Sequence, residues 1–394
     1  MNLAILHPDV QNFITNHLST DTLRLLLGKS PFKHVSTREL VEQIESKKRT
    51  EKKIPLWYHT KDIYFPNKLA IEQASSHLTA KYKAQLIKGE HVLDLTGGFG
   101  VDSYYFSLNA QQIIHCEINS DLSLIVKHNA KALQIPNLVT YIGDGINYLK
   151  NTTEVFSTIY IDPSRRLNTH KVFRIADCEP DVIAHFNILT ASGARLIIKT
   201  SPLLDITSGL SNLKNVSEIH ILSVKNDCKE LLWIIDPNFK GADPEIRCVA
   251  IGGDAQLETF LFKISEEKAF QNTLFSEPLN FIYEPDVSLL KAGCFKLITR
   301  EFNIQKLHQH AHLYTSEILN NNFIGRKFKL IKNWRYKHFI KENILKEAAV
   351  IARNFPLSVA ELKKKHQLTD GGTTYLFFTT DKCNQLIVLQ CQRL

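Results

Sequence analysis

A glycine-rich stretch, HVLDLTGGFGVDS, spans residues 91–103 and begins with a short apolar run. Gly97, Gly98 and Gly100 lie in the turn that follows this run. Glycine permits positive φ angles and a close approach of other groups to the backbone. A strand, a glycine-rich turn and a helix in this order are typical of nucleotide-binding α/β folds. The stretch therefore predicts a parallel sheet with a ligand site at the carboxyl end of its first strand.

The residues after the turn alternate between strand and helix patterns. Short β-branched runs are separated by intervals long enough for crossover helices, which is typical of a parallel sheet covered by helices. The five runs are VLDL, IIHCEI, LVTYIGD, TIYID and RLIIKT. IHILSV and ELLWIID are separated only by KNDCK, which predicts an antiparallel pair at the end of the sheet. Before the turn, residues 1–80 have a helical pattern, with Ser36 or Thr37 as a predicted helix cap.

The turn does not match the phosphate-binding patterns. A GxGxxG dinucleotide motif would need glycine where Ser103 stands, and Asp94 would face a pyrophosphate. No GK[ST] follows, which excludes a P-loop. Residues 94–100 instead resemble motif I of class I S-adenosylmethionine (SAM)-dependent methyltransferases, (D/E)xGxGxG, with Thr96 in place of the first glycine. A carboxylate at the strand end suits the ammonium group of the methionine moiety.

Three more acids end the strands that follow. Glu117 ends the second strand, where an acid can accept hydrogen bonds from the ribose hydroxyls, and Asp144 ends the third, where the resembling family contacts the adenine amino group. Asp162 ends the fourth strand. Taken singly, Asp94 or Asp144 could instead cap a helix, and Glu117 could be a surface residue. The predicted cofactor-binding residues are Asp94, Thr96, Gly97, Gly98, Phe99, Gly100, Glu117 and Asp144.

The sequence DPSRR at residues 162–166 occupies the position of motif IV, where the methyl acceptor meets the cofactor. Methyltransferases that modify amines usually have (D/N)PP(Y/F) there; here Ser164 and Arg165 replace the second proline and the aromatic residue. An arginine could stack on a base or bind a phosphate, and amine, carbon and oxygen acceptors stay open. Lys199, after the fifth strand, is either a further substrate contact or an exposed lysine. We predict Asp162, Pro163 and Ser164 as catalytic residues and Arg165, Arg166 and Lys199 as substrate-binding residues.

Four stretches extend the resemblance over roughly residues 70–394. They are DLTGGFGVDS, IDPSRR, YEPDVSLLKAG and FPLSVAELKKKHQLTDGGTTYLFFTT. With them the chain resembles a bacterial family of class I SAM-dependent methyltransferases with a THUMP-like C-terminal domain. DLTGGFGVDS is also similar to motif I of a bacterial 16S rRNA guanine-N2 methyltransferase.

The resemblance implies a Rossmann-like α/β fold, a seven-stranded sheet with an antiparallel last strand, small α+β domains near the C-terminus, SAM as cofactor and RNA as substrate. The predicted domains are an N-terminal helical domain (1–80), the methyltransferase domain (81–275), a ferredoxin-like unit (276–322) and a basic THUMP-like domain (323–394).

The segment of residues 320–366 is strongly basic. Its twelve lysines and arginines are opposed by three glutamates, so it carries a net charge of +9, against +8 for the whole chain. The basic residues are Arg326, Lys327, Lys329, Lys332, Arg335, Lys337, Lys341, Lys346, Arg353, Lys363, Lys364 and Lys365. Five aromatic residues are interleaved with them, namely Phe323, Phe328, Trp334, Tyr336 and Phe339. This pattern suits tRNA or rRNA whose bases can stack, or else a solvated helical surface with its aromatic side chains in the core.

Composition limits the remaining classes. No apolar run is long enough for a membrane span, and the N-terminus lacks a secretion signal. The seven cysteines form no CxxC pair, so we expect reduced thiols, a cytoplasmic location and no metal site. The leading hypothesis is a SAM-dependent RNA methyltransferase; the alternatives are a small-molecule methyltransferase with a structural C-terminal module and a non-catalytic RNA-binding protein. The pattern leaves the oligomeric state open.

Overall fold

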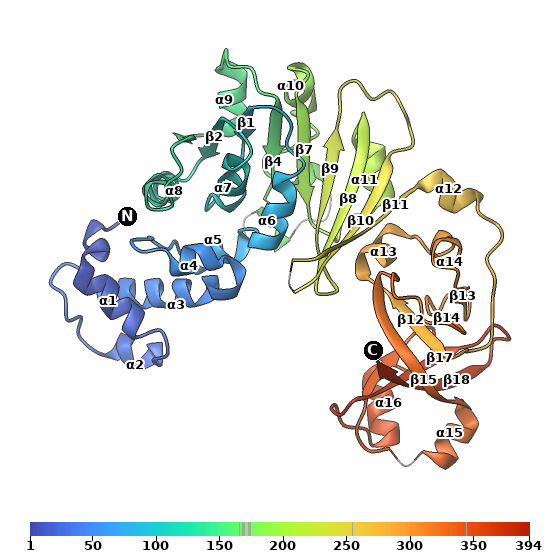
Figure 1. The fold of residues 1–394 in the computed structure, drawn as a ribbon. Coiled ribbons are helices and arrows are strands. Elements are labelled where there is room, and N and C mark those ends of the chain that lie inside the picture. The colour runs from blue at the N-terminus through green and yellow to red at the C-terminus, as the bar shows by residue number, and fades with distance from the viewer. Residues whose placement is uncertain (165, 168–169, 172–174, 254, 344) are drawn as a thin grey trace. The chain divides into compact units, whose positions relative to one another are not determined.

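The computed structural model describes residues 1–394 except 165, 168–169, 172–174, 254 and 344 (Figure 1). Contacts divide the chain into two compact units. The first comprises Met1–Ser217 and Leu231–Ala242, and the second comprises Glu218–Glu230 and Asp243–Leu394. The boundaries of the four predicted domains stay predictions.

The first eighty-odd residues are helical, as predicted. The elements are η1 (Leu3–Leu6), α1 (Pro8–Asn16), α2 (Thr22–Leu27), α3 (Thr37–Lys53), α4 (Pro55–His59), α5 (Lys68–Gln73) and α6 (His77–Ala84). Ser36 caps α3 with a capping box: its hydroxyl accepts the Glu39 N–H, and the Glu39 carboxylate accepts the Ser36 N–H. These helices share an apolar core that includes Trp57 and, from the glycine-rich turn, Phe99.

The predicted parallel sheet is present and has more strands than expected. Among the described residues it has nine strands: β1 (His91–Asp94), β2 (Gln112–Glu117), β3 (Leu138–Ile142), β4 (Thr158–Ile161), β7 (Arg195–Thr200), β8 (Val216–Val224), β9 (Asp227–Ile235), β10 (Glu245–Ile251) and β11 (Leu257–Lys263). Their order is β11-β10-β8-β9-β7-β4-β1-β2-β3. The strands β1, β2, β3, β4 and β7 pair in parallel, and β9 pairs antiparallel to β7. The Rossmann-like class is thus confirmed, and β10 and β11 add to the seven strands expected.

Short helices connect the strands of this sheet. They are α7 (Val101–Ser107), α8 (Ser120–Ala132), α9 (Gly145–Asn151), α10 (Phe186–Ala191) and α11 (Ile206–Asn212). The chain between β4 and β7 also contains a two-stranded hairpin, β5 (Arg166–Leu167) with β6 (His170–Lys171), and the 3₁₀ turn η2 (Ile175–Asp177). The crossovers place the carboxyl ends of β1, β2 and β4 side by side (Figure 1).

A second sheet contains the C-terminal strands. Its seven strands among the described residues are β12 (Phe281–Pro285), β13 (Gln305–Lys306), β14 (Tyr314–Ser316), β15 (Gly325–Arg335), β16 (Ala349–Ala352), β17 (Thr374–Thr380) and β18 (Leu386–Arg393), in the order β13-β14-β12-β15-β18-β17-β16. The helices of this region are α12 (Ile264–Ala269), α13 (Val287–Ala292), α14 (Leu297–Glu301), α15 (Tyr336–Glu342) and α16 (Val359–His366). Because β12 pairs with β15, the predicted ferredoxin-like and THUMP-like segments share one sheet.

The basic segment is helical only in part. Tyr336–Glu342 and Val359–His366 form α15 and α16, but residues 325–335 form β15, which pairs with β12 and β18. The aromatic side chains expected to stack on bases are mostly buried: Phe323, Phe328 and Phe339 have no exposed surface, and Trp334 is 8% exposed. They pack in the C-terminal core, which matches the structural alternative for these residues.

No helix among the described residues is long and apolar enough to cross a membrane.

Candidate functional site

The glycine-rich turn lies over the carboxyl ends of three strands. The Leu95 N–H donates to the Tyr160 carbonyl of β4 at 3.0 Å, and the Gly97 N–H donates to the Cys116 carbonyl of β2 at 2.8 Å. The turn is therefore held by the two strands that flank β1. Gly100 then starts α7 as its N-cap residue, with a left-handed φ of 77°.

Gly97 and Gly98 are required in this turn for different structural reasons. A Cβ at Gly97 would collide with the imidazole ring of His115. Gly98 has a φ of 56°, and a Cβ there would meet only the Thr96 carbonyl oxygen, at 3.9 Å. The backbone at Gly98 thus borders open space, as a cradle for a ligand requires. Phe99 has a different position: its ring is 4% exposed and lies 6.2 Å from the Trp57 ring, within the core.

Asp94 organises the turn from beneath. Its side chain is fully buried; Oδ1 accepts the Thr96 N–H at 3.1 Å, and Oδ2 accepts the Ser103 hydroxyl at 2.5 Å. The Ser103 hydroxyl also lies 2.9 Å from His115 Nδ1, and both of these side chains are fully buried. Burial raises the pKa of Asp94 to about 7, against the lowering effect of the Ser103 hydrogen bond, and burial lowers the pKa of His115 to about 4.

Both oxygens of Asp94 accept hydrogen bonds from the turn and the residue is fully buried, so the carboxylate holds the glycine-rich turn from below. Its predicted contact with the cofactor stays a prediction. Sequence reasoning missed Ser103 and His115. The signal available was the serine at the third-glycine position of the motif and the histidine inside the next strand.

Glu117 lies directly against the turn. Its Oε2 accepts the Gly98 N–H at 3.0 Å, and its Oε1 accepts the Asn119 N–H at 2.7 Å. The side chain is half-buried at the end of β2. A carboxylate oxygen has two lone pairs, so each oxygen keeps capacity for one further donor. The predicted proximity of the β2 acid to the glycines is therefore present.

Asp144 caps a helix, which is the alternative that the sequence left open for it. It is exposed and caps α9, with its Oδ1 accepting the Ile146 N–H at 2.7 Å. The next residue fits closely against the turn, because a Cβ at Gly145 would lie 2.8 Å from the Cα of Leu95. The loop after β3 thus borders the same site.

Asp162 joins motif IV to the glycine-rich turn. Its backbone N–H donates to the Thr96 hydroxyl at 2.7 Å, and its Oδ2 forms an ion pair with the Lys199 ammonium of β7. The side chains of Lys199 and Asp162 are 14% and 30% exposed. Lys199 is therefore a partly buried partner of Asp162, and the alternative of an exposed lysine is wrong.

The rest of motif IV is described in part. Pro163 is buried and Ser164 is exposed; the Ser164 backbone bridges to Glu179, with N–H to O distances of 2.7 and 2.9 Å. Arg165 lies outside the described residues. Arg166 is described by its backbone alone, in β5.

A buried ion pair lies behind the turn and was not predicted. Lys83 of α6 has no exposed surface, and its ammonium lies 2.9 Å from Asp102 Oδ1 of α7. The Asp102 Oδ2 also accepts the hydroxyls of Ser75 and Tyr160, both at 2.8 Å. Burial acts to raise the pKa of Asp102, but the nearby Lys83 and Lys199 ammonium groups and the hydrogen bonds give a net lowering. This network joins the N-terminal helices to α7 and to the strand that delivers Asp162.

Family models match the C-terminal part of the chain, and a solved structure matches nearly all of it. A THUMP domain-like family model matches residues 325–393, and a ferredoxin-like domain model matches residues 281–323. The chain is 31% identical to a candidate methyltransferase of known structure from Porphyromonas gingivalis W83, with a TM-score of 0.85; the match covers 99% of this chain and 98% of that chain.

Weaker structural matches cover less of the chain. They include SMU.1697c from Streptococcus mutans, a candidate methyltransferase in complex with SAH (17% identity, TM-score 0.30, 40% of this chain and 95% of that chain). They also include TrmK from M. capricolum in complex with S-adenosyl-homocysteine (15% identity, TM-score 0.31, 41% and 68%). Among curated proteins, none matches the sequence.

Proposed function

The chain belongs to the family of SAM-dependent methyltransferases with a C-terminal THUMP-like domain, and we propose that it transfers a methyl group from SAM to a base of tRNA or rRNA. The observation that carries the transferase part is the Thr96 hydrogen bond to Asp162, because it joins the cofactor turn to the acceptor motif. A methyl transfer requires these two parts to be held at a fixed separation.

The residues at the turn fit the proposed cofactor. The open space beside Gly98 and the remaining acceptor capacity of Glu117 suit a nucleoside with two ribose hydroxyls. Asp144, exposed at the edge of the site, is the proposed contact for an exocyclic amine of the base. When bound, SAM supplies an electrophilic methyl group on a sulfonium centre.

Asp162 is the proposed acceptor-orienting group. The Lys199 ammonium fixes the direction of this carboxylate, since the two groups form an ion pair. An ionised carboxylate accepts a hydrogen bond from an amine and so can align the nitrogen lone pair with the methyl group. Positioning is the main requirement of an in-line displacement, and a strong base is not needed.

The basic C-terminal segment supports RNA as the substrate. Four of its twelve cations form ion pairs: Arg326 and Arg353 with Glu284, Lys332 with Glu342, and Lys363 with Asp370. The other eight form none within the described part of the chain, namely Lys327, Lys329, Arg335, Lys337, Lys341, Lys346, Lys364 and Lys365. Cations without a carboxylate partner are available for phosphates; of these eight, Lys327 also donates to the Asn321 carbonyl and Lys365 lies over the Tyr336 ring.

The test is methyl transfer from tritiated SAM to total cellular RNA. We expect label in RNA with the wild-type protein and its loss with Asp162→Ala, whereas Asp205→Ala, the loss of a helix cap in the same unit, should retain most of the activity. If RNA stays unlabelled while a protein or small-molecule fraction takes the label, the substrate proposal is wrong.

A small-molecule methyltransferase is the second candidate. It is favoured by the burial of Phe323, Phe328 and Phe339, because these rings serve the core and are not exposed to bases. RNA binding decides between the two, since phosphate contacts are strongest at low salt. Absence of binding by the full chain at about 50 mM salt would favour the small-molecule candidate.

A further inference from the structure

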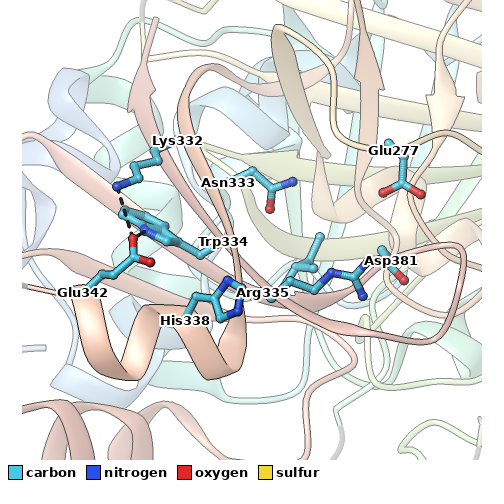
Figure 2. A pocket seen from close by; sticks show the side chains of 9 residues that line it. Glu277, Lys332, Asn333, Trp334, Arg335, His338, Glu342 and Asp381 are labelled. Atoms are coloured by element: carbon cyan, nitrogen blue, oxygen red, sulfur yellow. Dashed lines mark hydrogen bonds and ion pairs between the residues drawn. The ribbon is translucent and has the colours of Figure 1, made fainter.

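A pocket of about 400 Å³ lies in the C-terminal unit and is lined in part by the basic segment, but by none of the candidate cofactor or acceptor residues (Figure 2). It is lined by the end of β15, by α15 and by the turn between β17 and β18. Its volume is in the range of small-molecule sites. Most of its lining residues are polar or charged, so an apolar ligand would not satisfy them.

One wall of the pocket is fixed by its own contacts. The Lys332 ammonium lies 4.6 Å from the centre of the Trp334 ring and 3.6 Å from the Glu342 carboxylate. The Trp334 indole N–H donates to the same carboxylate at 3.1 Å (Figure 2). These three side chains therefore form a preorganised surface that includes the edge of an aromatic ring.

The other wall carries groups with capacity for a ligand. Arg335 lines the pocket, is exposed and forms no ion pair within the described residues. Asp381 is 2% exposed, and its Oδ1 accepts the N–H groups of Cys383 and Gln385 at 2.9 and 2.8 Å, so the carboxylate is held in place. Figure 2 shows Arg335 between His338 and Asp381.

We propose that this pocket binds one unpaired nucleotide, with the phosphate at Arg335 and the ribose or base donors at the carboxylates. A guanidinium offers paired donors to a phosphate, and carboxylates accept from hydroxyl or amino groups. The pocket is lined by two cations, Lys332 and Arg335, and by the three carboxylates of Glu277, Glu342 and Asp381, so a ligand that satisfies both needs a phosphate together with several hydroxyl or amino donors. A nucleotide carries both kinds of group. The proposal rests on the proposed function only in naming RNA as the source of that nucleotide.

The direct test uses the four 5′-nucleoside monophosphates as probes on the full-length protein. Equilibrium dialysis measures binding, with S-adenosylhomocysteine in excess to block the methyl-donor site. Tryptophan fluorescence reports the location, because Trp334 lines the pocket whereas Trp57 and Trp233 are 1% and 0% exposed in the other unit. We expect saturable binding of at least one nucleotide, tighter than that of inorganic phosphate, with a change in fluorescence that Trp334→Phe abolishes.

The matched variants are Arg335→Ala and Arg393→Ala. Both remove one exposed arginine of the same unit, but Arg393 does not line the pocket. We expect Arg335→Ala to weaken nucleotide binding at least tenfold and Arg393→Ala to change it less than twofold. Equal effects of the two variants, or no saturable binding in the millimolar range, would overturn the proposal. Nucleotide binding without RNA methylation would overturn the proposed function alone.

Discussion

Replacing Lys83 with methionine tests the buried network behind the cofactor turn. The change keeps a side chain of similar length and removes the ammonium, which leaves the Asp102 carboxylate buried with two hydroxyl donors and without its ion-pair partner. Breaking a buried ion pair from one side costs about 3–5 kcal/mol of the free energy of unfolding. For a unit of this size, that corresponds to a fall in Tm of about 6–20 °C by calorimetry.

The second variant, Lys83→Met with Asp102→Asn, separates charge from packing. An asparagine retains an oxygen that can accept a hydroxyl from Ser75 or Tyr160, and it removes the unpaired charge. We therefore expect the double variant to recover at least half of the lost stability. A loss below about 1 kcal/mol in the single variant, or no recovery in the double variant, would refute the ion-pair argument.

The pH dependence provides an independent check of this network. In the wild-type protein the pKa of Asp102 is lowered below 3.8, so this carboxyl contributes stability above pH 3.8 that is lost as the pH falls through the folded-state pKa. In Lys83→Met the unpaired buried carboxyl has a raised pKa, and its cost grows as the pH rises. The stability difference between the two proteins should therefore be smaller at pH 4 than at pH 7.

Three further variants address the cofactor turn and the acceptor. Gly97→Ala should abolish SAM binding in calorimetry, because its Cβ would overlap the His115 ring. Asp94→Asn should remove one source of the pH dependence of stability. Because the pKa of Asp94 is raised to about 7 in the folded protein, its carboxyl contributes stability that is fully present below pH 3.8 and is lost as the pH rises through 7. The Tm of the wild-type protein, measured relative to that of the variant, should therefore fall between pH 5 and 7. Lys199→Met should lower kcat about 10- to 100-fold with SAM affinity unchanged, because the ammonium contacts Asp162; a parallel loss of SAM affinity would contradict that separation.

The sequence predicted the location of the site better than the roles of its acids. Acids at successive strand ends must meet at one edge of a parallel sheet, and Glu117 and Asp162 do contact the glycine-rich turn. The pattern could not show which way each carboxylate is directed. Asp94 is engaged by the turn from below and Asp144 caps α9, since nearby N–H groups are the first donors available to each.

A β-bulge disturbs the strand pattern in the first part of the basic segment, residues 325–335. Phe328 and Leu330 alternate with Lys327 and Lys329, as a strand with one buried side requires. The register then shifts between Leu330 and Lys332, which leaves Ile331 52% exposed and buries Trp334. The extra residue of the bulge thus interrupts the alternation of buried and exposed side chains by which a strand is predicted. The Lys83–Asp102 pair had no sequence signal, because both residue types are usually exposed.

Burial of the aromatic rings changes how this unit would recognise RNA. Stacking on Phe323, Phe328 or Phe339 is excluded by their burial, so the exposed cations provide attraction to the phosphate backbone, which is independent of sequence. Discrimination among nucleotides must then come from sites with directional hydrogen-bonding groups. The two proposed sites have such groups: the acceptor site at Asp162 and the pocket beside Arg335. Charge-removing variants on the surface, Arg335→Ala included, should therefore weaken binding of all RNAs alike, whereas Glu342→Gln, which alters a carboxylate of the pocket, should also change which RNA is preferred.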